Sequence, residues 1–293
     1  MAILFAFLSL LGSAFNDLML KAYSGAGRSR GLFVSIVGLI WLLTVVWQAP
    51  GVQPDGSWSW GGTLLWGGIS GFCSVGGNIL LLLGMAVLPA GVCATIYRLN
   101  LVPVTLGAVL LLGERLSLGQ ALGILCALAA ILIMQPAADN AQADGDSGRR
   151  IKTRQRAFML LCLAALLRAG MGLSYRHGFT SGGASREWVV IINALFWVAG
   201  GIVYAIARER RRLRCDRTLL LYGSLSGLLV AAVVVTMALS TQYGNASLVL
   251  PIAQMSFLAT ALIGAPLFHE RITARTAGAL ALGASAVILI CLA

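Results

Sequence analysis

The chain has 293 residues, of which 59% are hydrophobic and only 11% are charged, and its mean hydropathy is +0.89. A soluble globular domain carries far more charge, so this composition excludes one. The stretches between the apolar runs are also too short to fold as a separate catalytic domain. The sequence therefore indicates an integral membrane protein that works within the bilayer.

Ten apolar stretches are long enough to cross a membrane, since a transmembrane helix needs about 20 mostly apolar residues. The first is followed at once by further spans, so we expect a retained helix there and not a cleaved signal peptide. The predicted fold is an all-α integral membrane protein with ten transmembrane helices. The expected spans are 2–22, 31–48, 62–86, 90–112, 118–135, 157–176, 187–206, 218–241, 246–268 and 273–293.

The net charge of +11 is distributed unevenly along the chain. Sixteen of the 21 Lys and Arg residues lie at the connections that follow the first, fifth, seventh and ninth spans, whereas the other side holds only Arg115, Arg176 and Arg186. By the positive-inside rule the basic connections face the cytoplasm. This predicts a multi-pass inner (plasma) membrane protein with both termini on the non-cytoplasmic side. We interpret the basic segments as topology signals and contacts to the anionic lipid bilayer, with no nucleic-acid partner.

The second half of the chain repeats the first at an offset of 156 residues. The segment LLLGERLSLGQALGILCALAAILIM at 110–134 aligns with PLFHERITARTAGALALGASAVILI at 266–290. The alignment needs no gap from the third span to the fifth, and it matches Glu114 with Glu270. Apolar composition alone would not reproduce these charged residues in register. The sequence therefore predicts two repeats of one structural unit.

Each repeat holds five spans, and because five is odd the second repeat enters the membrane from the opposite side. The repeats are therefore expected to be inverted, which is a common architecture of secondary transporters. The predicted organisation is a first five-helix repeat at 1–137, a basic linker loop at 138–156 and a second five-helix repeat at 157–293.

A family resemblance rests on small residues in the third span, Pro103 within the fourth, and GERLSLGQALG before an Ala- and Gly-rich fifth span. This repeated pattern resembles the drug/metabolite transporter superfamily, specifically its ten-helix EamA-like members, most strongly over 65–134 and 221–290. The resemblance implies a cavity lined by the third, fourth, eighth and ninth helices and the first helix of each repeat. It also implies transport of small organic metabolites. Many relatives begin with a basic tail and keep their termini in the cytoplasm; this chain lacks that tail, and we follow its own loop charges.

Arg98 lies eight residues into the fourth span, where a guanidinium costs several kcal/mol unless it faces water, a partner or a ligand. Its repeat counterpart, Gln254, is also polar. We interpret the two as parts of a substrate site, with a buried structural ion pair as the alternative for Arg98. The candidate substrate-binding residues are Arg98, Gln254, Tyr97, Asn78, Asn100 and Arg168.

Asp17 lies deep in the first span and has three interpretations. It is placed to pair with Lys21 one helical turn on, to act as a counter-ion for Arg98 or Arg168, or to titrate and so couple transport to protons. The sequence leaves these three alternatives open.

Two further paired features have structural interpretations. Gly67-x-x-x-Gly71 and its counterpart Gly223-x-x-x-Gly227 predict close helix packing. Glu114 and Glu270 are expected to be structural corner residues at the ends of their spans, with proton handling as the alternative.

Enzyme signatures are missing from the sequence, which has no HExxH, no GxSxG and no phosphate-binding Gly-rich loop. The six cysteines form no CxxC pair and suit small core positions, so we expect no metal, no cofactor and no enzymatic activity. The favoured function is a secondary active transporter that moves a small polar organic metabolite by alternating access. Two deep arginines against one deep aspartate favour an anionic substrate. The alternative is a flippase for a lipid or lipid-linked substrate.

Overall fold

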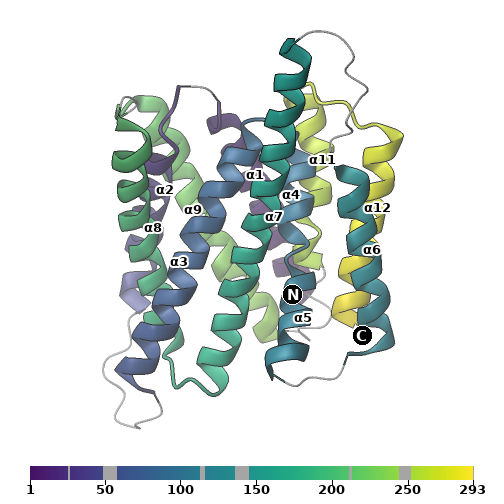
Figure 1. Ribbon diagram of the computed structural model, residues 1–293. Helices are drawn as coiled ribbons and strands as arrows, with labels where there is room; N and C mark the ends of the chain where they lie inside the picture. Colours follow the sequence, from purple (N-terminus) through teal and green to yellow (C-terminus); the bar gives the residue numbers. More distant parts are fainter. Residues whose placement is uncertain are drawn as a thin grey trace.

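The computed structural model describes residues 1–25, 27–48, 58–112, 116–135, 145–210, 213–243 and 252–292 (Figure 1). This described part is all-α and contains no β-strand. Glu114 and Arg115 lie outside it. Its elements are α1 (Ala2–Tyr23), α2 (Arg30–Val45), the short 3-10 helix η1 (Val46–Gln48), α3 (Trp60–Met85), α4 (Ala90–Arg98), α5 (Leu101–Leu112), α6 (Leu118–Met134), α7 (Gly145–Thr180), α8 (Arg186–Arg208), α9 (Arg217–Tyr243), α11 (Ser256–Leu267) and α12 (Ala274–Leu292).

Six helices among the described residues are long and apolar enough to cross a membrane, namely α1, α3, α7, α8, α9 and α12. Shorter apolar helices span Arg30–Val45, Leu118–Met134 and Ile252–Leu267. Large apolar side chains point outward, and Leu118 and Met159 are 78% and 70% exposed. Such a surface is unfavourable in water but suited to lipid. These properties are those of a membrane-embedded protein.

Side-chain caps begin several helices. The hydroxyl of Ser117 accepts a hydrogen bond from the Gln120 backbone N–H at 3.1 Å, and the Gln120 side chain accepts one from the Ser117 backbone N–H at 3.1 Å, which completes a capping box. At the equivalent place in the second half, Thr273 Oγ1 accepts from the Thr276 N–H at 3.2 Å. Both residues therefore cap the helix that follows, α6 and α12.

The fourth expected span is broken between α4 and α5. Pro103 has no N–H to donate to the Leu99 carbonyl, which accepts instead from the Val102 N–H at 3.1 Å. Leu99 has φ −73° and ψ 8°, and Met255, 156 residues later, has φ −73° and ψ 7°. Met255 separates a helical turn at 252–254 from α11. The second break occurs without a proline at the equivalent position.

The predicted linker loop at 138–156 is wrong in its second half, because α7 already begins at Gly145. From residue 149 to residue 156 the chain reads RRIKTRQR, which holds neither Gly nor Pro and consists mostly of good helix formers. The helix therefore continues beyond the apolar segment, as Figure 1 shows at the upper end of α7.

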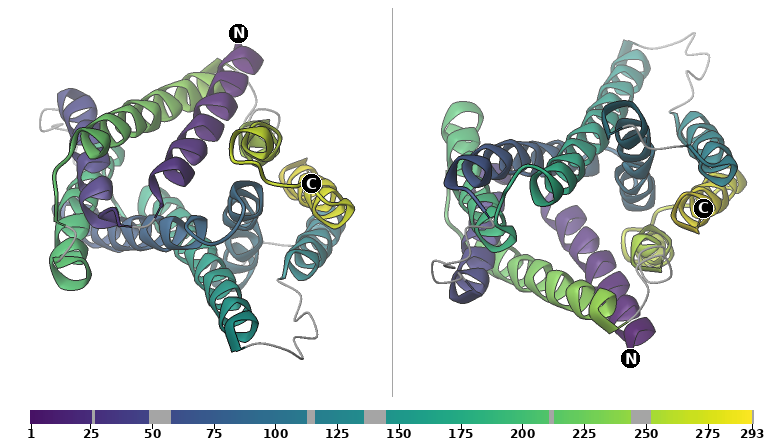
Figure 2. Two further views of the ribbon diagram at one scale, coloured as in Figure 1. Left: turned by 90° about the horizontal axis from the view of Figure 1, so that it is seen from above. Right: turned by 90° about the horizontal axis from the view of Figure 1, so that it is seen from below.

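Helix packing is organised in pairs of segments that are far apart in the sequence. α1 packs on α9, α3 on α7, α2 on α8, α4 on α11 and α6 on α12. Viewed along the helices, α1 and α9 lie on one side of the centre and α3 and α7 on the other (Figure 2). α2 and α8 lie at one edge, and α6 and α12 at the opposite edge. The residues that reach the centre therefore come from both halves of the chain.

The paired GxxxG positions are close packing points, as predicted. A Cβ on Gly71 would lie 2.7 Å from Phe196 Cγ of α8, and a Cβ on Gly227 would lie 2.6 Å from Ile40 Cβ of α2. Only hydrogen fits at these approaches. The two glycines thus allow equivalent crossings, α3 on α8 and α9 on α2.

The basic residues gather at the end where α1 stops and α2, α7, α9 and α12 begin, which lies at the top of Figure 1. We call this the basic end. The described basic residues at this end are Lys21, Arg28, Arg30, Arg149, Arg150, Lys152, Arg154, Arg156, Arg208, Arg210, Arg214, Arg217, Arg271 and Arg275.

Candidate functional site

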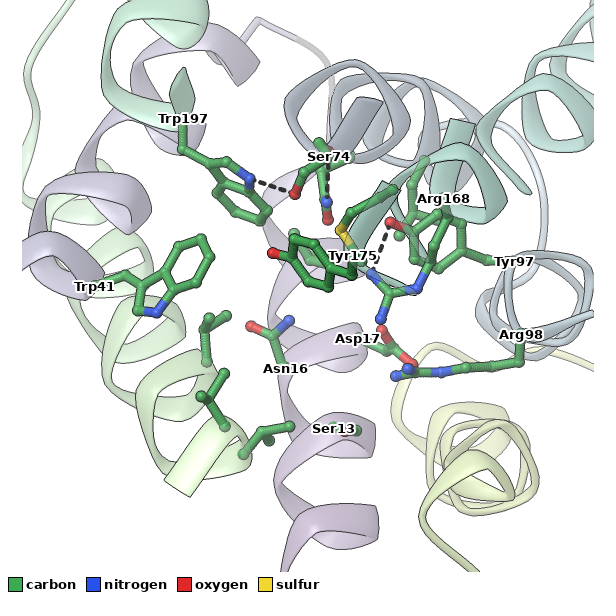
Figure 3. A pocket seen from close by; sticks show the side chains of 17 residues that line it. Ser13, Asn16, Asp17, Trp41, Ser74, Tyr97, Arg98, Arg168, Tyr175 and Trp197 are labelled. Atoms are coloured by element: carbon green, nitrogen blue, oxygen red, sulfur yellow. Dashed lines mark hydrogen bonds and ion pairs between the residues drawn. The ribbon is translucent and has the colours of Figure 1, made fainter. Parts of the chain in front are cut away.

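A cavity of about 210 Å³ lies between the two halves of the chain (Figure 3). Its walls come from α1, α2, α3, α4, α7, α8 and α9. Five residues expected at the site line it: Asp17, Asn78, Tyr97, Arg98 and Arg168. The structure therefore brings together side chains that lie up to 151 positions apart in the sequence.

The cavity lies near the middle of the helices. At a rise of 1.5 Å per residue, Asp17 is about 9 Å below the end of α1 and Arg98 is about 12 Å from the start of α4. A hydrocarbon core is about 30 Å thick. Charged side chains at this depth need partners, water or a ligand.

Asp17 is the counter-ion of Arg98. One carboxylate oxygen, Oδ2, lies 3.6 Å from Arg98 Nη2, and the side chains are 4% and 11% exposed. Thr260 of α11, which is fully buried, donates a hydrogen bond to the same oxygen at 3.2 Å. The ion pair therefore joins α1, α4 and α11.

The interpretation of Asp17 as the partner of Lys21 is wrong, because Lys21 is engaged elsewhere. Its Nζ lies 3.2 Å from Glu270 Oε1 and donates to the backbone carbonyls of Met85 and Leu88 at 2.9 and 2.7 Å. Glu270 in turn accepts the Ala90 N–H at 2.9 and 3.1 Å, at the positive N-terminus of α4. Glu270 is thus the corner residue that the sequence predicts, and with Lys21 it joins the end of α1 to the start of α4.

Arg168 lies over Tyr97. Its Cζ is 4.9 Å from the centre of the Tyr97 ring, and its Nη1 donates a long hydrogen bond of 3.4 Å to the Tyr97 hydroxyl. Arg168 is also near enough to Asp17 for the two charges to interact. The two arginines and Asp17 form one cluster at one end of the cavity (Figure 3).

The other end of the cavity is aromatic and apolar. Trp41 and Trp197 meet edge to face with their ring centres 5.8 Å apart. The Trp197 indole N–H donates to Ser74 Oγ at 2.8 Å, whereas the Trp41 N–H has no hydrogen-bond partner among the described residues. Three valines of α9 also line the cavity: Val230, Val233 and Val234.

Tyr175 and Asn16 lie between the two ends, and the Tyr175 hydroxyl points from the arginine cluster toward the two tryptophans (Figure 3). Asn16 Oδ1 accepts a hydrogen bond from Ser226 of α9 at 2.5 Å. Sequence reasoning singled out neither residue, nor the two tryptophans. Asn16 had a signal, since it is a polar residue deep in a span beside Asp17. The tryptophans had none, because in an apolar span a cavity-lining indole resembles a lipid-facing one.

Two expected site residues are not among the lining residues. The side-chain nitrogen of Asn100 faces the last turn of α4 and donates hydrogen bonds to the backbone carbonyls of Arg98 and Tyr97 at 3.0 and 3.2 Å. Asn100 therefore supports the end of α4. Gln254 lies in the helical turn before Met255 and is partly buried. Asn100 was expected at the site because it lies close to Arg98 in the sequence, and Gln254 because it is the repeat counterpart of Arg98. Neither criterion fixes the direction in which a side chain points.

A second hollow, of about 330 Å³, lies between α2, α8 and α9 toward the opposite end. Its walls are mostly aliphatic, with Arg186 and Glu187 among them, and it shares Val234 with the central cavity. Arg98 does not line it.

No protein-family model and no curated protein matches the chain. Among solved structures, 19 chains match. One is described only as a crystal structure of a protein; it is 16% identical, has a TM-score of 0.62, and the match covers 98% of this chain and 95% of that chain. At this identity the likeness shows the fold alone. The fold therefore occurs over nearly its full length in a known structure.

Proposed function

We propose that the protein is a secondary active transporter of the EamA-like drug/metabolite type, which moves a small polar, anionic organic metabolite by alternating access. The observation that carries the proposal is the cavity between the two halves, with Asp17, Arg98 and Arg168 at middle depth. Charges at this depth mark substrate or ion pathways in membrane proteins. A cavity of about 210 Å³ suits a small organic solute.

Ten spans in two inverted repeats are supported by the packing. If the two halves are equivalent, each contact between helices should have a counterpart with the halves exchanged. The contact of α3 with α7 has its counterpart in that of α9 with α1, and the contact of α3 with α8 has its counterpart in that of α9 with α2. α2 with α8, α4 with α11 and α6 with α12 are pairs of equivalent helices. α4 and α5 count as one broken span, and Leu99 and Met255 break equivalent spans. Broken helices beside a central site are common in inverted-repeat transporters.

The charge pattern supports placing the basic end in the cytoplasm and both termini outside an inner membrane. The Lys21–Glu270 pair bridges α1 and the N-terminus of α4 at that end. We infer that this contact closes the cytoplasmic side in the present conformation and opens when the two halves exchange their arrangement.

The alternative of a lipid flippase calls for a lateral apolar gap that includes Arg98. The hollow between α2, α8 and α9 is apolar, but Arg98 does not line it. The observations therefore favour a water-soluble solute over a lipid.

The proposal is tested in proteoliposomes that contain the purified protein, with uptake of a defined mixture of organic acids, amino acids, sugar phosphates and nucleotides measured by mass spectrometry. We expect at least one solute to accumulate, and its uptake to fall at least tenfold in Asp17→Asn. Gly61→Ala, at a position with nothing within 4 Å of the added Cβ, is the matched control and should transport normally. Movement of a fluorescent phospholipid with no solute uptake would instead establish the flippase.

A further inference from the structure

The cavity holds two arginines with different electrostatic surroundings. Arg98 is paired with Asp17 at 3.6 Å, and Asp17 also accepts from Thr260. Arg168 has no carboxylate within ion-pair distance among the described residues, and its one hydrogen bond there is the 3.4 Å contact to Tyr97. A guanidinium carries five N–H donors, so most of those of Arg168 are available to a ligand.

The charges of the lining residues do not cancel. Asp17, Arg98 and Arg168 are the ionisable residues with a full charge among the described lining residues, so these side chains together carry a net charge of +1. An uncompensated positive charge at membrane depth is costly. One anionic group bound at Arg168 would bring the site to neutrality and supply the fork of acceptors that a guanidinium prefers.

The rest of the cavity excludes a substrate that is charged throughout. Trp41 and Trp197 line the end away from Arg168, with Tyr175 and Asn16 between the two ends (Figure 3). Three valines of α9 add apolar surface to the cavity. Desolvating a second charge against these walls would be unfavourable. An apolar cavity of about 150 Å³ accepts one benzene molecule. A cavity of about 210 Å³ therefore accommodates one ring and a short acidic side chain.

We propose that the substrate is an amphipathic organic monoanion, with a carboxylate held by Arg168 and an apolar or aromatic body against Trp41 and Trp197. This inference rests on the proposed function and names its substrate class. A separate ammonium group is disfavoured, because Asp17, the one carboxylate among the described lining residues, is already engaged by Arg98 and Thr260. Arg98 is then a positioning residue, which holds Asp17 and the end of α4 in place, and Arg168 is the binding residue.

The test compares matched probes on the wild-type protein in nanodiscs by isothermal titration. The probes are 3-phenylpropionate, its neutral analogue 3-phenylpropan-1-ol, the short anion propionate, the zwitterion phenylalanine and the cation 2-phenylethylamine. We expect 3-phenylpropionate to bind at least tenfold more tightly than each of the others, which corresponds to about 1.4 kcal/mol. Equal binding of the acid and the alcohol, or tighter binding of propionate or phenylalanine, would overturn the assignment.

The variants locate the carboxylate. Arg168→Gln is expected to weaken 3-phenylpropionate at least tenfold and to leave the weaker binding of 3-phenylpropan-1-ol unchanged, whereas Arg186→Gln, outside the cavity, should change neither. A loss of both probes to the same extent would mean that Arg168 is merely structural. Because the probe comparison uses the wild-type protein, a variant that fails to fold does not remove the test.

The outcomes also separate this inference from transport itself. If proteoliposomes accumulate a neutral or zwitterionic solute and the phenyl acid does not bind, the substrate class is wrong and the transporter stands. If 3-phenylpropionate binds through Arg168 but no solute crosses the membrane, the binding site for an organic monoanion is supported and the proposed transport function is refuted.

Discussion

The Asp17–Arg98 pair predicts an asymmetric response to neutralising its two members. Asp17→Asn leaves Arg98 and Arg168 together with no anion, and raises the net charge of the cavity from +1 to +2. Removing one partner of a buried ion pair costs about 3–5 kcal/mol. Since the side chains of Asp17 and Arg98 are only 4% and 11% exposed, we expect a loss of about 4 kcal/mol from the free energy of unfolding.

Arg98→Gln should cost less, about 3 kcal/mol at the lower end of that range, because Asp17 keeps its hydrogen bond from Thr260 and the longer-range attraction of Arg168. The double variant returns the cavity to a charge of +1, so its loss should be well below the sum of the two single losses. The coupling expected between contacting residues is about 1–3 kcal/mol.

The free energies are measured by titration with a denaturing detergent in mixed micelles, as a complete double-mutant cycle. Asp216→Asn is the matched carboxylate control: Asp216 caps α9 through the Leu219 N–H at 2.8 Å, and asparagine caps equally well. Additive losses, or a larger loss for Arg98→Gln than for Asp17→Asn, would refute the ion pair as the organising contact of the site.

Two further predictions concern the contacts around the cavity. Glu270→Ala removes the acceptor of the Ala90 N–H and should lower the free energy of unfolding by about 1–3 kcal/mol; an unchanged thermal midpoint would contradict the capping role. Gly71→Ala places a methyl group 2.7 Å from Phe196 and should cost about 1–3 kcal/mol in the same thermal assay. Gly61→Ala, on the same helix and with nothing within 4 Å, should be neutral or stabilising, and equal losses for the two glycines would contradict tight packing of α3 on α8.

The all-α membrane character could be predicted from the sequence because it depends on composition and on the length of apolar runs. The paired glycines and the helix caps at Ser117 and Thr273 were also predictable, since each depends on residues close together in the chain. The break at Leu99 was not predicted: Pro103 was noted within the fourth span, but one continuous helix was expected there. Its counterpart at Met255 has no proline four residues on, so no local signal marks it.

The charged half of the site was predictable and the aromatic half was not. Asp17, Arg98 and Arg168 are conspicuous because charge inside an apolar span is costly. Which of them pair is a property of the tertiary structure, so the sequence left Lys21, Arg98 and Arg168 open as partners of Asp17; the structure pairs Asp17 with Arg98, and Lys21 with Glu270. Trp41 is apolar in an apolar helix, and only the packing of α2 on α8 turns it toward the cavity.

The central claim is that one cavity opens alternately to the two sides of the membrane. Ser13 lines the cavity, so Ser13→Cys, after replacement of the six native cysteines, reports access to a membrane-impermeant thiol reagent added to right-side-out or inside-out vesicles. Ser70→Cys, fully buried and away from the cavity, is the matched control and should stay unlabelled. The account predicts labelling of Ser13→Cys from both sides, each slowed by a bound substrate. Labelling from one side only, unchanged by any solute that the protein binds, would contradict alternating access.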